Sequence, residues 1–491
     1  MNDIIAVAND LIWGSVLMYL LLGAGLFFTL STRFVQIRRF PQACKTMLTS
    51  RNRDCKTHIS PFQTFCTSLA ARIGTGNMAG VAVAIYLGGP GAVFWMWMIA
   101  LLGMATSVAE NILAQLYKTN NHDGTFRGGP AYYIEKAMKM RWLGIIFSIS
   151  LIIAFGFAFN SVQANSIAAA FSGYGIPVHW MGIALAVTSA LIIFGGIRSI
   201  SRVAEMIVPA MAIGYLAVAL VIVAFNISEL PAIFTLIVKS AFGLETAVGG
   251  GAGYMVSQAM MQGVKRGLFS NEAGMGSAPN AAAAAHASHP GSQGMIGMLG
   301  VFMDTMVVCT ATASIILMSG ALESGSGVTG IELTQMALSS QVGSWGEHLV
   351  ALAILLFAFT SIIANYYYGE SNLRFICESK KLVAVYRVLV LGMVIWGAVG
   401  SLPTVWAFAD LSMGIMALIN LIAILSLSKI VLMVLKDYDE QLGSGIAEPI
   451  FRRKKFPFLD KSIDKDVWQE KSTAVTGKPA NTSASGSAVL N

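Results

Sequence analysis

Two stretches of the sequence, ARIGTGNMAGVAVA at residues 71–84 and RGLFSNEAGMGSAP at residues 266–279, share one pattern. The pattern is N-x-A-G-x-x-x-A, which begins at Asn77 in the first copy and at Asn271 in the second, and an arginine stands five positions before each asparagine. Glycine weakens a helix interior, and a cation is expensive at membrane depth. The two stretches therefore predict a pair of related, unwound segments inside otherwise apolar helices.

The segments around both stretches are apolar and long enough to cross a membrane. Of the 491 residues, 55% are hydrophobic and only 12% are charged, about half of the charged share that is usual in a soluble domain. Uninterrupted apolar runs of about 20 residues indicate membrane helices rather than the alternating strands of a barrel. We therefore expect an all-α membrane protein with about eleven transmembrane helices, at residues 12–32, 61–88, 92–117, 144–171, 178–196, 204–225, 254–285, 294–319, 349–368, 382–400 and 402–435.

Positive charge is distributed unevenly between the connecting segments. Residues 33–60 and 118–143 are rich in Lys and Arg, whereas residues 172–177 and 320–348 contain neither. Since Lys and Arg collect on the cytoplasmic side of membrane proteins, we expect the N-terminus outside and the C-terminus in the cytoplasm of a bacterial cell, with the bundle in the inner membrane. The net charge of +7 is spread over these loops and a tail, so it does not indicate a nucleic-acid partner.

The two stretches also face opposite directions across the membrane. By the order of the spans, the first runs from inside to outside and the second, five helices later, from outside to inside, which indicates an inverted-topology repeat. This organisation divides the chain into five parts. Residues 1–33 form a peripheral N-terminal helix and residues 34–60 a basic cytoplasmic loop. The two inverted repeats follow at residues 61–225 and 226–435, and residues 436–491 form a cytoplasmic tail that is expected to be disordered.

Unwound backbone inside a membrane offers polar groups to a ligand. Freed amides and helix N-termini attract a carboxylate, and freed carbonyls and helix C-termini attract a cation. A zwitterionic amino acid together with a sodium ion satisfies both. The alternative is a pair of kinked helices that pack closely through glycine and bind nothing.

Three motifs carry a resemblance to a known family. GTGN at residues 74–77, GGPAYYI at residues 128–134 and SNEAGMGSAP at residues 270–279 resemble the signatures of the alanine/glycine:cation symporters, and the likeness extends from about residue 10 to residue 440. The resemblance implies a leucine-transporter-like core of five plus five inverted helices, with discontinuous first and sixth core helices and one helix before them. It also implies sodium-coupled import of a small neutral amino acid by alternating access, with no organic cofactor.

The same resemblance implies a substrate site at the two unwound segments. In the first segment, backbone groups of Thr75, Gly76 and Asn77 are expected to bind the substrate carboxylate, and the Asn77 side chain is expected to help hold the substrate. The second segment is expected to contribute Ser270, Asn271 and Gly274.

Two further residues are assigned to this site. Gln163 offers both a donor and an acceptor to the substrate ammonium or to polar backbone, and polar packing is its alternative role. Trp406 is expected to cap the pocket and limit the size of the substrate side chain, and its alternative role is an anchor at the membrane interface.

A sodium site is implied beside the first break. Carbonyl groups just before the turn bind sodium in the wider fold, and here they belong to Ala70 and Ile73. The partner hydroxyls correspond to the adjacent pair Thr360 and Ser361, with Phe357 one turn earlier. Hard oxygen ligands of this kind suit a small cation. The alternative role of the two hydroxyls is hydrogen bonding between helices.

Five acidic residues fall inside or at the edge of the spans, and they keep proton coupling open as an alternative. For Glu272 we expect an ion-paired structural role, because Lys265 and Arg266 precede it closely. The other four acids are Glu110, Glu205, Asp304 and Asp410.

Other classes of protein are disfavoured by missing motifs. The sequence has no HExxH, GxSxG or GxxxxGK[ST] pattern, so we expect neither a membrane enzyme nor an ATP-driven pump. A glutamine-type transporter of the same fold and an ion channel remain alternatives. The residues do not distinguish alanine from glycine or glutamine, do not separate L from D substrates, and do not determine an oligomeric state.

Overall fold

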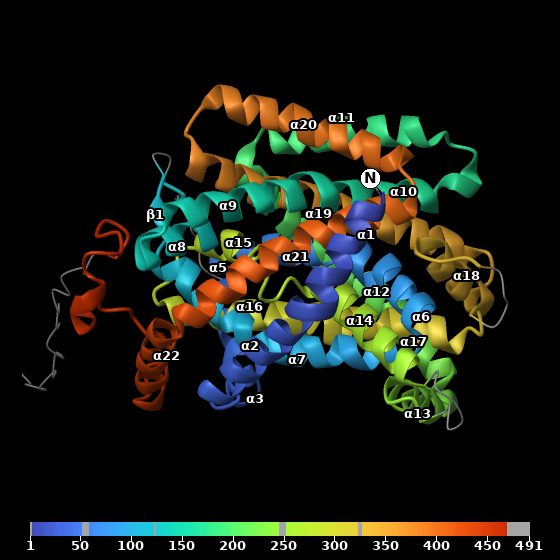
Figure 1. Cartoon of the computed structure of the whole chain (residues 1–491), viewed down its shortest axis with the longest axis horizontal. Helices are drawn as coiled ribbons and strands as arrows, with labels where there is room; N and C mark the ends of the chain where they lie inside the picture. The colour runs from blue at the N-terminus through green and yellow to red at the C-terminus, as the bar shows by residue number, and fades with distance from the viewer. Residues whose placement is uncertain (1, 52–57, 122–123, 245–251, 323–326, 469–491) are drawn as a thin grey trace, which may run out of the picture.

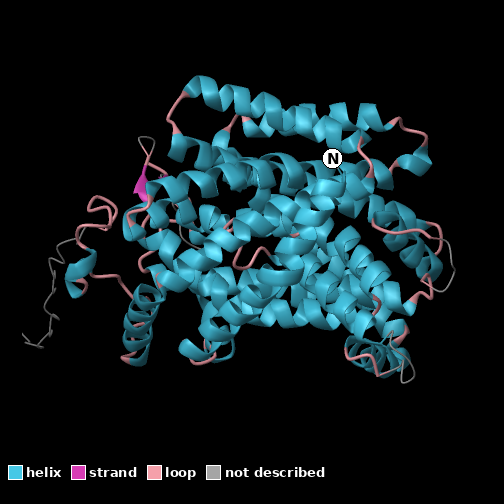
Figure 2. Cartoon of the chain, in the orientation of Figure 1, coloured by secondary structure: helices cyan, strands magenta, loops and turns pink. Residues whose placement is uncertain are grey.

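The computed structural model describes residues 2–51, 58–121, 124–244, 252–322 and 327–468. Within them the chain is mostly helical, and a short antiparallel hairpin, β1 (Thr119–Asn120) with β2 (Phe126–Arg127), lies at one end of the bundle (Figure 2). Residues 52–57 of the expected basic loop and residues 469–491 of the expected tail lie outside the described residues.

Many helices are long and apolar enough to cross a membrane. Eight qualify within the described residues: Ile5–Ser31, Gly91–Leu116, Arg141–Ala170, Gly196–Phe225, Pro290–Met318, Trp345–Ile376, Lys380–Val399 and Leu402–Ser426. Two shorter apolar helices, Gly76–Gly88 and Val178–Ile193, accompany them. The expected spans 61–88 and 254–285 are broken near the middle, so neither is among the eight.

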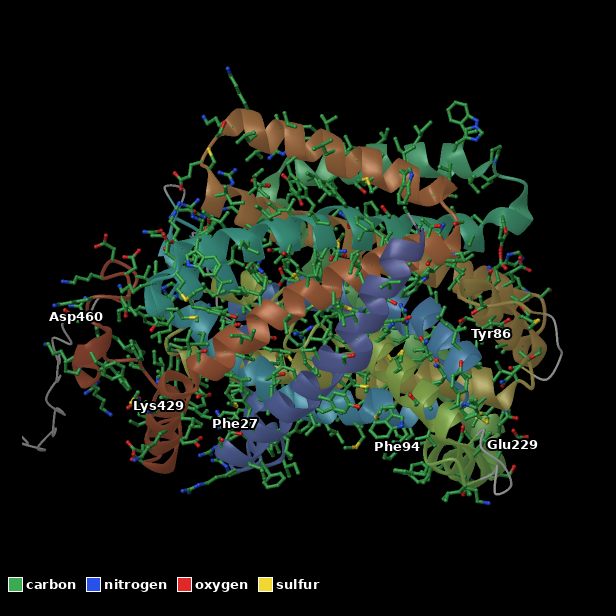
Figure 3. All side chains as sticks on the ribbon, in the orientation of Figure 1. Phe27, Tyr86, Phe94, Glu229, Lys429 and Asp460 are labelled. Atoms are coloured by element: carbon green, nitrogen blue, oxygen red, sulfur yellow. The ribbon has the colours of Figure 1, made fainter. Side chains whose placement is uncertain are left out.

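The outer surface of this bundle is apolar. On α12 (Gly196–Phe225), Met206, Ile213 and Leu220 recur every seven residues and are 70%, 69% and 67% exposed. Figure 3 labels Phe27 and Tyr86, two more large side chains that are exposed on other helices. Stripes of exposed apolar residues at helical spacing are unfavourable in water and favourable in lipid, so the chain is a multi-pass membrane protein.

The first broken helix is formed by α5 (Pro61–Arg72), the π-helical turn η2 (Gly76–Gly80) and α6 (Val81–Gly88). α5 begins with a capping box, in which the Ser60 hydroxyl accepts from the Gln63 N–H and the Gln63 side chain accepts from the Ser60 N–H. It ends at Ile73, whose φ of −75° and ψ of 93° are extended backbone. The last carbonyl groups of α5 are therefore left without helical partners, as the glycines of this segment predict.

The second broken helix is formed by α14 (Ala252–Asn271) and the short α15 (Pro279–Ala283). Between them, Gly274 and Gly276 have φ of 86° and 84°, in the left-handed region that glycine enters without penalty. Glu272 also has a positive φ, 59°, which costs a residue with a Cβ about 1 kcal/mol or more. This break is thus held open by the surrounding structure as well as by its glycines.

The two broken helices lie in the interior of the bundle. α7 (Gly91–Leu116) packs along α14 and α16 (Pro290–Val301), and α5 packs against α12 and α19 (Trp345–Ile376). The long helices of the outer layer include α11 (Val178–Ile193) and α20 (Lys380–Val399), which lie side by side along one edge of the molecule (Figure 1). The N-terminal helix, Asn2–Ser31, packs across α7 and α21 (Leu402–Ser426).

The remaining elements complete the layers around this interior. They are α1 (Asn2–Leu11), η1 (Ile12–Leu17), α2 (Met18–Ser31), α3 (Val35–Arg38), α4 (Phe40–Arg51), α8 (Pro130–Met138), α9 (Arg141–Leu151), η3 (Ile152–Phe159), α10 (Asn160–Ala170), η4 (Ser172–Tyr174), η5 (Ile227–Glu229), α13 (Leu230–Ala241), η6 (Phe302–Cys309), α17 (Thr310–Met318), α18 (Ile331–Val342), α22 (Ser428–Gly443), η7 (Arg453–Lys455) and η8 (Pro457–Leu459).

Several connections contain helices that the sequence patterns did not predict. α4 lies in the segment expected as a loop, and α13 and α18 lie in connections between spans. The expected span 402–435 is divided at Leu427 into α21 and α22. These helices pack on the bundle, so their apolar faces are partly buried by neighbours that a local pattern does not reveal.

The expectation of a disordered tail from residue 436 is wrong for residues 436–468. These residues complete α22, form η7 and η8, and fold back on the bundle, where the Phe451 N–H donates to the Ser288 carbonyl and the Trp468 ring N–H donates to the Leu116 carbonyl. Buried aromatic side chains, Phe451, Phe456 and Trp468, provide the apolar contacts that the polar composition of the tail conceals.

Candidate functional site

Side-chain oxygens cap the backbone at the first break. The Gly74 N–H donates to Asn77 Oδ1 at 2.9 Å, and the Thr75 N–H donates to Gln163 Oε1 at 2.9 Å. Gln163 comes from α10, in the expected span 144–171, so a side chain from another membrane segment holds the break in place. Thr75, Asn77 and Gln163 are each 2% exposed or less, and the site is closed in this conformation.

The two breaks meet at a buried carboxylate. A Cβ on Gly76 would lie 3.0 Å from the Ser270 Cα, so the first break lies directly against the end of α14. Asp304, on the π-helical turn η6, accepts from Asn77 Nδ2 at 2.6 Å on Oδ1 and from Ser270 Oγ at 2.8 Å on Oδ2. Asp304 therefore links residues of both unwound segments.

Neighbouring polar groups extend this link. Thr305 Oγ1 donates to Asp304 Oδ2 at 2.7 Å, and Asn271 Nδ2 donates to Thr305 Oγ1 at 3.2 Å. The Cys309 thiol lies 3.2 Å from Ser270 Oγ. Of the residues expected from the second segment, Ser270 and Asn271 thus join the network around Asp304.

Oxygen atoms converge at the end of α5. The Ser361 hydroxyl on α19 lies 2.8 Å from the Ala70 carbonyl oxygen, 3.4 Å from the Ile73 carbonyl oxygen and 3.0 Å from the Phe357 carbonyl oxygen. One hydroxyl proton serves one of these acceptors at a time. The C-terminal end of a helix is also a region of negative potential, so the cluster suits a cation with hard oxygen ligands.

Thr360 lies beside this cluster with different partners. Its hydroxyl donates to the Phe357 carbonyl at 2.9 Å and lies 3.9 Å from the Met211 sulfur. The structure therefore brings four of the five expected sodium ligands, Ala70, Ile73, Phe357 and Ser361, into direct contact, and it joins Thr360 to them through the Phe357 carbonyl.

Aromatic rings form a wall beside the breaks. The Phe269 ring stacks on Phe159, with centroids 4.3 Å apart, and meets the Trp406 ring at 4.7 Å. Trp406 is 5% exposed and also packs under the guanidinium of Arg266, at 4.3 Å from the ring centroid. This burial favours a role in the interior for Trp406 over a role as a lipid-interface anchor.

The second break has its own polar partners. The Gly274 N–H donates to Glu110 Oε1 at 3.2 Å, and Asn420 Nδ2 donates to Glu110 Oε2 at 3.0 Å and to the Gly274 carbonyl at 2.8 Å. Asn420 also accepts a hydrogen bond from the Tyr133 hydroxyl. The backbone of Gly274 thus contacts Glu110 and Asn420, and it is not among the groups that bind Asp304.

The expected ion pairs of Glu272 with Lys265 and Arg266 are wrong. Lys265 and Arg266 point to Asp410, at 4.0 Å and 2.6 Å, because a turn of α14 carries them to the face that α21 covers. Glu272 accepts from the Ser277 hydroxyl instead, at 2.6 Å.

Sequence patterns did not identify the role of Asp304, although it was one of the five acids within the spans. A carboxylate in an apolar segment was the available signal. Its two partners, Asn77 and Ser270, are far away in the sequence, and neither spacing nor composition predicts that pairing. Tyr133 belongs to the GGPAYYI motif, but no role was assigned to it, and Asn420 carried no signal beyond being a polar residue in apolar surroundings.

The fold and these clusters define a class: a multi-pass membrane protein whose two broken helices meet at a closed, polar centre. Comparison with known proteins identifies the family. The model of the sodium:alanine symporter family matches residues 1–453, and the chain belongs to this family of transporters.

Relatives of known name cover nearly the whole chain. The chain is 49% identical to the probable sodium/glutamine symporter GlnT of Bacillus subtilis, over 92% of this chain and 93% of that protein. It is 47% identical to the amino-acid carrier protein AlsT of Bacillus subtilis, over 96% and 98%. It is 41% identical to the sodium/alanine symporter AgcS of Methanococcus maripaludis, over 89% and 97%.

Solved structures give a more distant likeness. A manganese transporter of Eremococcus coleocola is 16% identical and matches with a TM-score of 0.48, over 81% of this chain and 84% of that chain.

Proposed function

We propose that the protein is a sodium-coupled symporter that imports a small neutral amino acid, alanine or glycine, by alternating access. The observation that carries the proposal is the contact of Ser361 Oγ with the Ala70 and Ile73 carbonyl oxygens at the end of the broken helix α5. Sodium, as a cotransported substrate, would take these carbonyls together with the Ser361 and Thr360 hydroxyls and the Phe357 carbonyl.

The substrate site is proposed at the first break and the start of the second. The Gly74 and Thr75 amides are occupied by Asn77 and Gln163 oxygens in the closed conformation. A substrate carboxylate would replace these weaker acceptors, because an anion binds backbone amides more strongly than a neutral amide oxygen does. The freed side chains would then be available to the substrate ammonium.

Side-chain size in the cargo is limited by the aromatic wall. Phe269 and Trp406 lie against the first break, where a Cβ on Gly76 would be 3.1 Å from Phe269 and a Cβ on Gly80 would be 3.5 Å from Trp406. Little room is left for a long side chain, which supports alanine or glycine. Glutamine is the second candidate, because the name of the relative at 49% identity specifies a glutamine symporter.

Coupling requires that sodium favours one conformation of the protein over the other. The end of α5 supports such an effect, since a cation there ties α5 to α19 across the break. We further propose a five-plus-five inverted repeat, 61–225 and 226–435, that rocks around this centre. The basic connections support an inner-membrane orientation with the N-terminus outside and the C-terminus in the cytoplasm.

Uptake by reconstituted protein tests the proposal. Purified protein in liposomes is given labelled alanine, glycine or glutamine, with an inward sodium gradient or a proton gradient alone. Sodium-dependent accumulation of alanine that Ser361→Ala weakens is the expected result. Uptake of glutamine alone would show that glutamine, and not alanine or glycine, is the substrate. Uptake driven only by a proton gradient would show that the coupling ion is the proton and not sodium. If none of the three amino acids is taken up, the proposal is rejected.

A further inference from the structure

Glu272 is a fully buried carboxyl group with few partners. It lies in the second break with a φ of 59° and is 0% exposed. Its Oε2 accepts from the Ser277 hydroxyl at 2.6 Å. Its Oε1 has no hydrogen-bond partner among the described residues, which is unusual for a buried oxygen that carries charge.

The other two acids of the centre have more donors. Asp304 accepts from the side chains of Asn77, Ser270 and Thr305. Glu110 accepts from the backbone N–H of Gly274 and from the Asn420 amide. Donors of this kind stabilise an ionised carboxylate. Among the three acids, Glu272 therefore has the least support for a negative charge.

The surrounding charges do not compensate for three carboxylates. Glu272 interacts electrostatically with Arg72 from α5, Glu110 from α7, Asp304 from η6 and Tyr368 from α19. Lys265 and Arg266, on the helix α14 that ends just before Glu272, are paired with Asp410. Among the described residues, Arg72 is then the cation that interacts with all three acids, and two negative charges are left in excess when all three are ionised.

Arg72 is also buried with part of its hydrogen-bonding capacity unused. Its side chain is 2% exposed, and its Nη1 donates to the Gly297 carbonyl at 3.3 Å. Its Nε and Nη2 have no partners within the described part of the chain. The Arg72 guanidinium thus has two nitrogens, and the Glu272 carboxyl one oxygen, that are buried without a hydrogen-bond partner among the described residues. Such groups indicate a polar centre whose charge and hydrogen bonding change during function.

We propose that Glu272 is a proton-binding site, occupied in the closed conformation, and that exchange of its proton makes transport depend on pH. One proton leaves water and forms a bond to Oε1, which removes the charge of the carboxylate. Sodium at Ala70 and Ile73 would add positive charge next to Arg72, so sodium binding and protonation of Glu272 are expected to oppose each other. This goes beyond the proposed sodium coupling and rests on it only for the uptake measurement.

Infrared spectroscopy of the purified protein tests the proton directly. The wild type is expected to show the carbonyl stretching band of a protonated carboxylic acid, which Glu272→Gln removes and the exposed control Glu440→Gln retains. The band is expected to weaken when sodium is added at constant pH. The proposal is overturned by a spectrum in which Glu272→Gln removes no band at any pH.

Uptake in liposomes gives the second measurement. Glu272→Gln, a neutral side chain of similar shape, is expected to retain transport and to lose its dependence on pH between pH 5 and 9. Ser277→Ala removes the hydrogen-bond donor that the described residues supply to the Glu272 carboxylate, so it is expected to raise the pH midpoint of the band and of uptake by about one unit. If Glu272→Gln does not fold, an unchanged midpoint in Ser277→Ala overturns the proposal. The infrared measurement does not depend on which substrate is transported. It therefore tests the proton site even if the protein transports no alanine.

Discussion

Gly74 and Ser361 are in such close contact that a Cβ at position 74 would overlap the Ser361 hydroxyl. The same Cβ would lie 2.8 Å from Gln163 Oε1. Ser361 contacts the carbonyl oxygen of Ala70, and Gln163 caps the N–H of Thr75, so position 74 joins the proposed sodium site to the proposed substrate site.

Gly74→Ala is therefore expected to reduce sodium-driven uptake by about tenfold or more, which corresponds to about 1.4 kcal/mol and lies within the usual range for overpacking a core. Initial uptake rates in liposomes provide the measurement. Gly214→Ala is the matched control, since a Cβ there meets nothing within 4 Å. Equal rates for the two variants would contradict a functional contact between Gly74 and Ser361.

Ser361→Ala and Thr360→Ala are expected to differ in their effect on sodium. Ser361 touches two carbonyls of α5, whereas Thr360 touches the Phe357 carbonyl and the Met211 sulfur. We expect the half-saturating sodium concentration to rise by about tenfold for Ser361→Ala and by about threefold for Thr360→Ala. Ser150→Ala, which loses a comparable bond to a backbone carbonyl on an exposed face, should leave it unchanged. An unchanged sodium dependence in Ser361→Ala would remove the proposed site.

Asp304→Asn tests the link between the two breaks. The change replaces an acceptor of three side-chain hydrogen bonds by an amide that places a donor against Asn77 or Ser270. Breaking a buried, charge-assisted group of bonds costs roughly 2–5 kcal/mol, so uptake should fall by about 30-fold or more. The exposed Asp460→Asn serves as the control, because its ion pairs lie at the surface. Wild-type uptake by Asp304→Asn would show that the carboxylate does not hold the breaks together.

The folded segment after α21 predicts a pH dependence of stability. His289 Nδ1 accepts from the Gly291 N–H, so the proton of the neutral ring is on Nε2, which donates to Asp437 at 3.1 Å. Burial lowers the pKa of His289, against the raising effect of Asp437. Burial acts to raise the pKa of Asp437, but hydrogen bonds from His289 and Lys455 hold it at about 2, so this carboxylate stays ionised above pH 5.

The direction in which stability changes with pH follows from these pKa shifts. Because the folded pKa of His289 lies below that of the unfolded chain, about 6.5, its contribution to stability is complete above that pH and is lost as the pH falls. His289→Gln keeps a donor and an acceptor but does not titrate. The melting temperature of the wild type is thus expected to fall relative to His289→Gln between pH 8 and pH 5. The exposed His179→Gln is the control, and a constant difference between wild type and His289→Gln would contradict the prediction.

Local sequence was enough to predict where the chain breaks and that it contains many helices long and apolar enough to cross a membrane. Gly74 and Gly76, inside an apolar segment, are incompatible with an ordinary helix interior, and the structure has its break there. The motif resemblance also led to Ala70, Ile73 and Ser361, which the structure brings together. The polar composition of residues 436–468 did not predict their folded structure, in which a few buried aromatic side chains and hydrogen bonds hold the segment against the bundle.

What the sequence alone determined are properties that depend on neighbours along the chain: apolar spans, unwound glycine segments, the asymmetry of basic residues and the family motifs. Only the tertiary structure decided which polar groups share a partner. Asp304 accepts hydrogen bonds from both Asn77 and Ser270. Arg266 pairs with Asp410 and not with Glu272, which accepts a hydrogen bond from Ser277. The physical reason is that a buried charge is stabilised by whatever donors surround it in space, and in a membrane interior those donors come from helices that are distant in sequence.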